Sequence, residues 1–349
     1  MAFEGIINEQ EFYSQHYLSK ILQRVIKPWE EELEKKEKDS KAALADGSAK
    51  NKEQEWRTPW SRLNAAAPKL LKKISDLENL YGAKSRIEET EQITVELMSL
   101  LGLPAIKKED ISAEGSIVPL FSQKVSENGR PYLWVFSAVS ENFRDEVTDP
   151  DPLNQKVLPQ QLINESDTEL KEFKDHANDT WLEILSKRVF GLPNAPRWVI
   201  LTGAEEWVLI DKAKFDQRRV LRFKWKDILS IRNPKVLKVV SYLLGNDAFS
   251  EEEQTSRLAE LESKSFKHAQ GVSEDLKYAM REAVELLGNE AAEQLRKKAQ
   301  IDKKAFYSVL KAEDLSAECL RYLYRLLFLF FIESRPDLQY APMSDMHYV

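Results

Sequence analysis

The chain has 349 residues, of which 42% are hydrophobic and 31% are charged, and its formal net charge is −7. This amount of apolar material is enough for two packed bodies. The negative charge excludes a protein that binds nucleic acid through a global basic field, so any DNA contact must be a local patch. A single cysteine, Cys319, excludes an internal disulfide framework and a cysteine-built zinc site, and favours the cytoplasm.

No membrane segment is expected. The N-terminus lacks the basic and apolar regions of a signal peptide. The most apolar run, residues 326–332, is far shorter than the roughly 20 residues that span a bilayer. We therefore expect this run to be a buried helix.

The first hundred residues favour helices. Apolar side chains at helical spacing predict a helix over residues 8–27, which Pro28 would end. Residues 30–54 are a mixed charged run that predicts an exposed helix fraying into a mobile insert. Pro68 is expected in the first turn of a second helix, and a third amphipathic helix is expected over about 84–101.

The middle of the chain favours strands. Residues 116–121 and 132–138 are β-branched and aromatic, and Asn128-Gly129 between them predicts a tight hairpin. A helix is expected over roughly 167–189. After it, a second hairpin and one more strand are predicted, over residues 197–201, 206–210 and 219–223.

From residue 226 onward almost every segment has a helical period. The clearest helix is 273–287, with Ser273 as N-cap and Gly288 as its end. The order predicts an α+β fold, a small mixed sheet flanked by helices, followed by an all-helical domain. We divide the chain into an N-terminal helix and insert (1–55), an α+β domain (56–225) and a helical connector (226–349).

Residues 84–211 resemble the core of a PD-(D/E)XK nuclease, in which an Asp and a Glu-x-Lys hold a divalent metal and polarise water. Here Ser137 stands where the metal-binding Glu would be, and Val139 stands where the lysine would be. A degenerate scaffold is one interpretation. The other is an active, Mg²⁺-dependent site with relocated groups, for which the candidates are Glu89 with its neighbours Glu88 and Glu91, Glu114, and Lys124.

A basic segment covers residues 217–226. Its alternation places Arg222, Lys224 and Lys226 on one face, and Arg218 and Arg219 precede them. These five side chains are candidates for DNA phosphate contacts. The alternative is an edge strand that its charges protect from aggregation.

The sequence contains no motif for a metal site, a nucleotide-binding loop or an adenine-methyltransferase catalytic loop. The four histidines are scattered, so no metal site is expected. The sequence also contains neither a P-loop nor a dinucleotide-binding turn, so no cofactor is expected in this chain. Residues 233–236, Asn-Pro-Lys-Val, lack the second proline and the aromatic residue of an adenine-methyltransferase loop.

Three segments, residues 5–18, 198–207 and 323–328, carry a resemblance that extends thinly over the chain. It is similar to the region upstream of the methyltransferase domain in large adenine-specific restriction-modification methylases. These are the type IIG class and its relatives in phage-defence systems such as DISARM and BREX. The resemblance implies a longer parent whose later part binds S-adenosylmethionine and methylates adenine N6 in a flipped base. In active relatives the upstream domain cuts DNA.

We therefore expect the N-terminal, non-methyltransferase part of such a protein, positioning double-stranded DNA or a partner such as another defence-system subunit. Its end at residues 347–349 fits truncation before the methyltransferase domain. Two alternatives remain open: a metal-dependent endonuclease with relocated ligands, and an interaction scaffold that does not bind DNA.

Overall fold

The computed structural model describes residues 3–45, 56–80, 82–103, 107–113, 116–139, 151–163, 174, 178–251, 256–301 and 311–334. The chain divides into two compact units, Met1–Phe266 and Lys267–Val349. The expected boundary at residues 225 and 226 therefore falls inside the first unit. The expected α+β class with a helical C-terminal region is confirmed. Among the described helices, none is long and apolar enough to cross a membrane.

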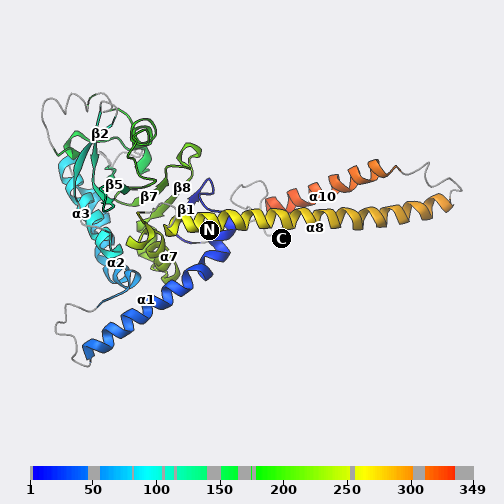
Figure 1. Ribbon diagram of the computed structural model, residues 1–349, viewed down its shortest axis with the longest axis horizontal. Coiled ribbons are helices and arrows are strands. Elements are labelled where there is room, and N and C mark those ends of the chain that lie inside the picture. Colours follow the sequence, from blue (N-terminus) through cyan, green and yellow to red (C-terminus); the bar gives the residue numbers. More distant parts are fainter. Residues whose placement is uncertain are drawn as a thin grey trace. The chain divides into compact units, whose positions relative to one another are not determined.

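A six-stranded mixed sheet forms the centre of the first unit, with the order β1-β8-β7-β6-β5-β4 (Figure 1). A separate hairpin pairs β2 with β3. Within the large sheet only β5 and β6 are parallel, and the other neighbours are antiparallel. The strands are β1 (Ile6–Glu9), β2 (Glu109–Ala113), β3 (Ser116–Leu120), β4 (Ser122–Val125), β5 (Pro131–Ser137), β6 (Trp198–Thr202), β7 (Glu206–Asp211) and β8 (Val220–Lys224).

Helices cover both faces of this sheet. The longer ones are α1 (Leu22–Ala45), α2 (Pro59–Asp76), α3 (Ala83–Leu101), α7 (Pro234–Leu244), α8 (Arg257–Ile301) and α10 (Ala312–Ser334). Two shorter α-helices are α5 (Trp181–Ile184) and α6 (Trp225–Ile231). Single turns of 3-10 and π-helix are η1 (Tyr17–Ile21), η3 (Leu77–Asn79), η4 (Pro152–Asn154), η5 (Pro159–Gln161), η6 (Leu185–Val189), η7 (Phe215–Gln217) and η8 (Asn246–Ala248).

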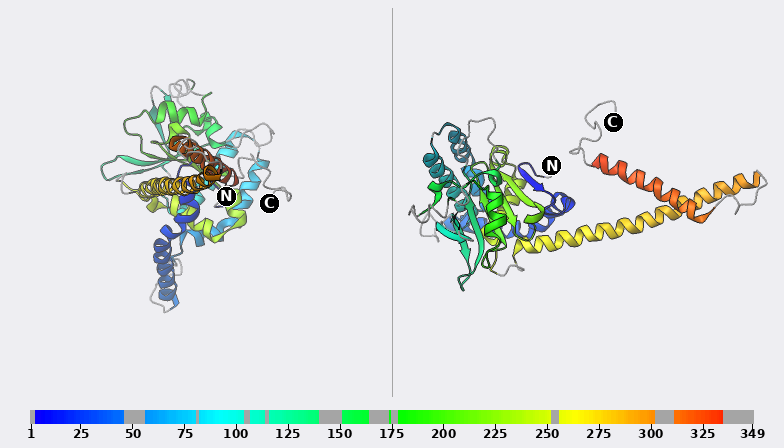
Figure 2. Two further views of the ribbon diagram at one scale, coloured as in Figure 1. Left: turned by 90° about the vertical axis from the view of Figure 1, so that its right-hand side faces the viewer. Right: turned by 90° about the horizontal axis from the view of Figure 1, so that it is seen from above.

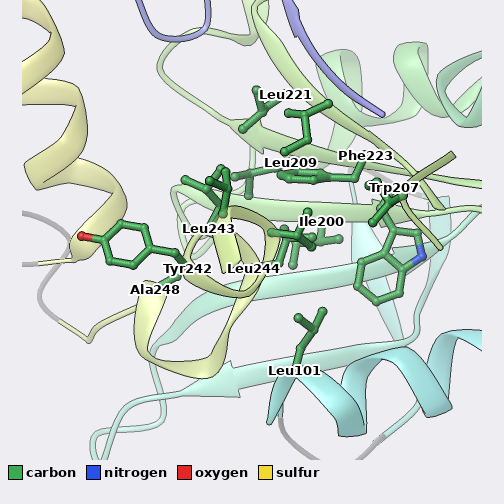
Figure 3. Close-up of a cluster of buried hydrophobic side chains, with 14 of the residues drawn as sticks. Leu101, Ile200, Trp207, Leu209, Leu221, Phe223, Tyr242, Leu243, Leu244 and Ala248 are labelled. Atoms are coloured by element: carbon green, nitrogen blue, oxygen red, sulfur yellow. The ribbon is translucent and has the colours of Figure 1, made fainter. Parts of the chain in front are cut away.

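The alternation of side chains along each strand creates two cores. On one face, Ile200, Leu209 and Leu221 pack with α2, α3, α6 and α7. Figure 3 shows Leu243 and Leu244 of α7 in this core together with Ile200, Leu209 and Leu221 of the sheet. On the other face, Val199 and Val208 pack with α5, η6 and the β2-β3 hairpin. Both faces are covered, which explains why β6 reads as a continuous buried run.

The N-terminal segment differs from the expected single helix. Residues 6–9 form the edge strand β1, and α1 continues through Pro28 instead of ending there. Trp29 explains why the helix continues, since its ring packs against Trp60 and Tyr242 at centroid distances of 5.2 and 5.1 Å. Such tertiary packing offsets the backbone hydrogen bond that proline cannot make. Part of the expected charged insert, residues 46–55, lies outside the described residues.

The α2 helix begins earlier than Pro68. Thr58 is its N-cap, and its hydroxyl accepts a hydrogen bond from the Ser61 amide at 3.3 Å. A second helix reinforces this cap, because the Glu37 carboxylate of α1 accepts hydrogen bonds from the Thr58 amide and the Ser61 hydroxyl, both at 3.2 Å. Burial acts to raise the pKa of Glu37, but hydrogen bonds from Lys41 and Thr58 outweigh it and lower this pKa to about 2.

Glu37→Gln is expected to destabilise the chain by about 1–2 kcal/mol, because it removes a charge-assisted cap from the positive end of α2. The depressed pKa means that the stabilisation is present above the ordinary value near 4.5 and is lost as pH falls through about 2. Urea unfolding at pH 7 and pH 3 measures both effects. The matched control is Glu31→Gln on the exposed face of the same helix, and an equal loss in both variants would contradict the role of Glu37.

Buried and partly buried ion pairs join the start of α8 to the sheet. Arg197 donates to Asp211 through Nε at 3.1 Å and Nη2 at 2.7 Å, and it also donates to Glu262 of α8. Lys214 pairs with the same glutamate at 3.0 Å. We call Arg197, Asp211, Lys214 and Glu262 the α8 anchor. Tyr13 adds a hydrogen bond from its hydroxyl to the Leu258 carbonyl at 3.2 Å, so the first turns of α8 belong to the first unit.

The second unit contains the rest of α8 and α10. The expected N-cap and end of the 273–287 helix are wrong, because α8 runs without interruption from Arg257 to Ile301. Ser273 donates to the Ala269 carbonyl at 3.0 Å, as a serine inside a helix does. Gly288 is tolerated within the helix, at a cost of about 1 kcal/mol relative to alanine.

Candidate functional site

The parallel pair β5 and β6 ends at the residues where the sequence analysis expected a nuclease centre. Ser137 is opposite Thr202 in the strand register, and the Ala138 amide donates to the Thr202 carbonyl at 2.7 Å. The Thr202 hydroxyl donates to the Phe136 carbonyl at 3.1 Å. These contacts fix the end of β5 with main-chain and hydroxyl groups.

A glutamine completes this arrangement. Gln161 is 7% exposed, and its Nε2 donates to the Ser137 carbonyl at 2.7 Å while its Oε1 accepts from the Leu158 amide at 3.0 Å. Val139 packs with Leu158 and with Ile87 of α3. The place of the expected glutamate and lysine is thus occupied by a buried hydroxyl and a buried aliphatic side chain, and the local contacts are those of a protein interior.

The hydroxyls of Thr90 and Thr94 on α3 and of Ser137 are buried and have no hydrogen-bond partner among the described residues. The three residues are at most 3% exposed. A buried hydroxyl that makes no hydrogen bond costs about 1–3 kcal/mol.

Ser137→Ala is therefore expected to leave the free energy of unfolding unchanged or to raise it by about 1 kcal/mol, because the substitution removes an unsatisfied group and leaves a volume smaller than a methyl group. Thermal and urea unfolding test this. The comparison variant is Thr202→Ala, which removes a hydroxyl that does donate a hydrogen bond and should lower stability by about 1 kcal/mol. A loss above 1 kcal/mol in Ser137→Ala would contradict the interpretation.

The described candidates for relocated catalytic groups lie on different elements, the glutamates on α3 and Lys124 on β4. Glu89 lies half-buried on α3. Lys124, on β4, donates to the Asn246 carbonyl at 2.9 Å and lies over the Tyr132 ring at 5.0 Å. Burial lowers the pKa of Lys124, although Asp247 acts in the opposite direction. Glu114 lies outside the described residues, within which no group of three or more His, Cys, Asp or Glu side chains could hold a metal.

The basic segment is arranged differently from the expected single face. The strand β8 ends at Lys224, and Lys226 already belongs to α6. The strand lies between β1 and β7, so the edge-strand interpretation is wrong. Arg218, Lys224 and Lys226 are exposed and Arg219 is half-buried. Arg218 and Arg219 precede the strand, whereas Lys224 and Lys226 lie at its other end.

Arg222 differs from the other four basic residues because its side chain is buried. Its guanidinium donates to Asp151 at 2.7 and 2.8 Å, to Glu206 at 2.6 Å and also to Glu9. We call these four residues the Arg222 cluster. Burial acts to lower the pKa of Arg222, but hydrogen bonds to the three carboxylates raise it above its usual value. Burial also raises the pKa of Glu206, against the opposing effect of Arg222.

The Arg222 cluster thus places one cation among three carboxylates that come from β1, β7 and the N-cap of η4. The sequence pattern alone could not separate Arg222 from its neighbours, because the acids that surround it are up to 213 positions away in the chain. A buried aliphatic or aromatic residue on each side, Leu221 and Phe223, was the only local sign that this part of the strand is interior.

Comparison of the chain with models of protein families, with curated proteins and with solved structures gives no significant match.

Proposed function

We propose that the first unit is a non-catalytic, nuclease-like module that holds double-stranded DNA for an adenine-specific DNA methyltransferase of the restriction-modification or phage-defence type. The observation that carries the proposal is the parallel β5-β6 pair, flanked by α3 and α5, with Ser137 and Val139 at its end. The succession of α3, β4, β5, α5 and β6 supports the likeness to a nuclease core, and the two side chains argue against cleavage.

The argument against cleavage comes from the chemistry of the end of β5. Hydrolysis of a phosphodiester by a divalent metal needs carboxylate oxygens that hold the ion close to the attacking water. A serine hydroxyl is a poor substitute for a carboxylate, and a valine offers no ligand. The hydrogen bonds of Gln161 to both neighbouring strand and loop backbones favour a structural role for this end of the sheet.

DNA contact is assigned to three exposed cations and the half-buried Arg219, which lie at the two ends of β8. Lys224 and Lys226 lie at one end of the strand, and Arg218 and Arg219 precede the other. Side chains of this kind bind phosphates without reading sequence, and their contribution falls as salt rises. Arg222 is not part of this set, because three carboxylates already occupy its guanidinium.

Methyl transfer belongs to a part that binds S-adenosylmethionine, in the same parent protein or in a partner subunit of the defence system. The residues of this chain would contribute orientation of the DNA, so that the methyltransferase acts on a duplex already held in place. This division agrees with the local basic residues in a chain whose net charge is −7.

The proposal is tested by incubating the 349-residue chain with supercoiled plasmid and with a 30-base-pair duplex, each in the presence of Mg²⁺ or Mn²⁺. We expect the duplex to be retarded at low salt and the plasmid to remain uncut with both metals. Nicking that Glu89→Gln or Lys124→Met abolishes would overturn the non-catalytic assignment in favour of a relocated nuclease centre. A duplex that is not retarded at about 50 mM salt would overturn the DNA-binding assignment.

A further inference from the structure

An apolar groove lies between α8 and α10 in the second unit. Its volume is about 340 Å³. Its apolar lining comes from both helices: Leu276, Met280 and Val284 of α8 and Leu320 of α10. The right-hand view of Figure 2 shows α10 running close to α8 and diverging from it toward the C-terminal end of α10.

The groove continues into an exposed stripe along α10. Leu320, Tyr324, Phe328 and Phe331 follow one another at intervals of four, four and three residues, so they share one face of the helix. They are 49%, 70%, 51% and 47% exposed, respectively. The expectation that residues 326–332 form a buried helix is wrong, because residues 328–331 are exposed and the other three are only half-buried. An apolar surface of this kind usually marks an interaction site.

Positive charge lines the groove. Both charged residues there, Lys277 and Arg281, are cations. On α10, the exposed Arg321 and Arg325 each directly follow a residue of the stripe, and the exposed Asp314 and Glu318 lie on the same flank. Arg281 pairs with Glu285 and Arg321 pairs with Glu318, but both are exposed pairs within one helix. Exposed pairs of this kind contribute little to stability, so they would compete little with a partner's carboxylates.

The same charges argue against a second copy of the chain as the occupant. Leu320, Tyr324 and Phe328 are spaced evenly about Tyr324, so two α10 helices could pair antiparallel about a two-fold axis at that residue. In that pairing Arg325 would lie beside Arg325 of the other copy. These two like charges disfavour the pair.

We infer that the groove and the stripe bind an amphipathic helix of a partner protein, with large apolar side chains on one face and acidic residues beside them. The apolar face of the partner helix would bind in the groove, with anchoring side chains spaced three and four residues apart. The acidic flanks would meet Lys277 and Arg281 on one side and Arg321 and Arg325 on the other. This inference does not depend on DNA binding by the first unit.

The test uses two synthetic helical peptides with the same leucine positions, one flanked by glutamates and the other by lysines. Fluorescence anisotropy with the full chain at about 100 mM salt measures their affinities. We expect the glutamate peptide to bind at least about tenfold more tightly than the lysine peptide. The double variant K277E/R281E should reverse this preference, whereas Met280→Ser should weaken both peptides. The control K297E changes an exposed lysine further along α8 and should change neither affinity.

Equal binding of the two peptides would overturn the inference, and so would a preference that K277E/R281E does not alter. Sedimentation equilibrium provides a second test, because it measures whether the chain is a monomer or a dimer. A chain that dimerises through this surface, shown by a dimer that Met280→Ser dissociates, would assign the surface to a second copy and contradict the inference. A monomer that binds the glutamate peptide with one-to-one stoichiometry would support it.

Discussion

Replacement of Arg222 by methionine is expected to lower the free energy of unfolding of the first unit by about 3 kcal/mol. The substitution keeps the side-chain volume but leaves Glu9, Asp151 and Glu206 without their shared cation. Removing one partner from a buried ion pair typically costs about 3–5 kcal/mol. We expect the lower end of that range, because the three carboxylates retain some access to water.

The pH dependence distinguishes this cause from a simple packing defect. Without Arg222 the three crowded carboxylates repel one another and their pKa values rise, so the folded state takes up protons as pH falls. The penalty should therefore be larger at pH 8 than at pH 5. The control Lys224→Met changes the exposed lysine two positions along the strand and should shift stability by less than about 0.5 kcal/mol. A penalty that is independent of pH would contradict the account of the Arg222 cluster.

Replacement of Arg197 by leucine is expected to cost about 3–5 kcal/mol and to loosen the start of α8. Asp211 has a fully buried side chain, and the substitution removes two of its hydrogen bonds. The hydrogen bond that remains, from the Ala213 amide at 3.0 Å, does not neutralise the carboxylate. Hydrogen exchange of residues 257–266 should accelerate, because Glu262 loses one of its two cations.

The double variant Arg197→Leu/Asp211→Leu distinguishes the cost of an unpaired Asp211 carboxylate from the cost of altered packing. Replacing both partners of a buried pair by apolar residues is often nearly neutral, so we expect more than half of the lost stability to return. Lys187→Leu, in an exposed pair with Glu183, is the control and should have little effect. If the double variant were less stable than Arg197→Leu alone, burial of an unpaired Asp211 carboxylate could not be the cause of the loss.

Elements with strong local signals were predictable from the sequence. The Asn128-Gly129 turn precedes β5 as expected, and the Gly129 backbone has a φ of 75°, the left-handed conformation that this turn favours. The expected partner strand is wrong, because β5 pairs with β4, whereas residues 116–120 form β3 and pair with β2 in a separate hairpin. The second hairpin, β6 with β7, and the helix α3 also agree with the pattern of apolar residues. In each case neighbouring residues contain enough information to specify the element. The expected helix over 167–189 is described only in its last part, where α5 and η6 lie.

The structure differs from the sequence-based expectations where contacts with residues far away in the chain determine the local conformation. The strand β1 exists because β8, more than two hundred residues later, offers an unpaired edge. The continuation of α1 through Pro28 depends on rings from α2 and α7. Arg222 looked equivalent to Lys224 because alternation along a strand does not reveal which carboxylates lie beside it. In the same way, the composition of residues 326–332 indicated burial, although only part of that helix surface is covered.

The most direct test of the central claim, that this chain holds DNA through exposed cations beside β8, is the salt dependence of duplex binding. The quadruple variant R218A/R219A/K224A/K226A leaves the Arg222 cluster intact and should remain folded. Each phosphate contact contributes about 0.9 to the slope of log K against log salt. The account predicts that the variant's slope is smaller in magnitude by about 2–4 and that its affinity at 50 mM salt is lower by at least tenfold. An unchanged slope and affinity in a folded variant would contradict it.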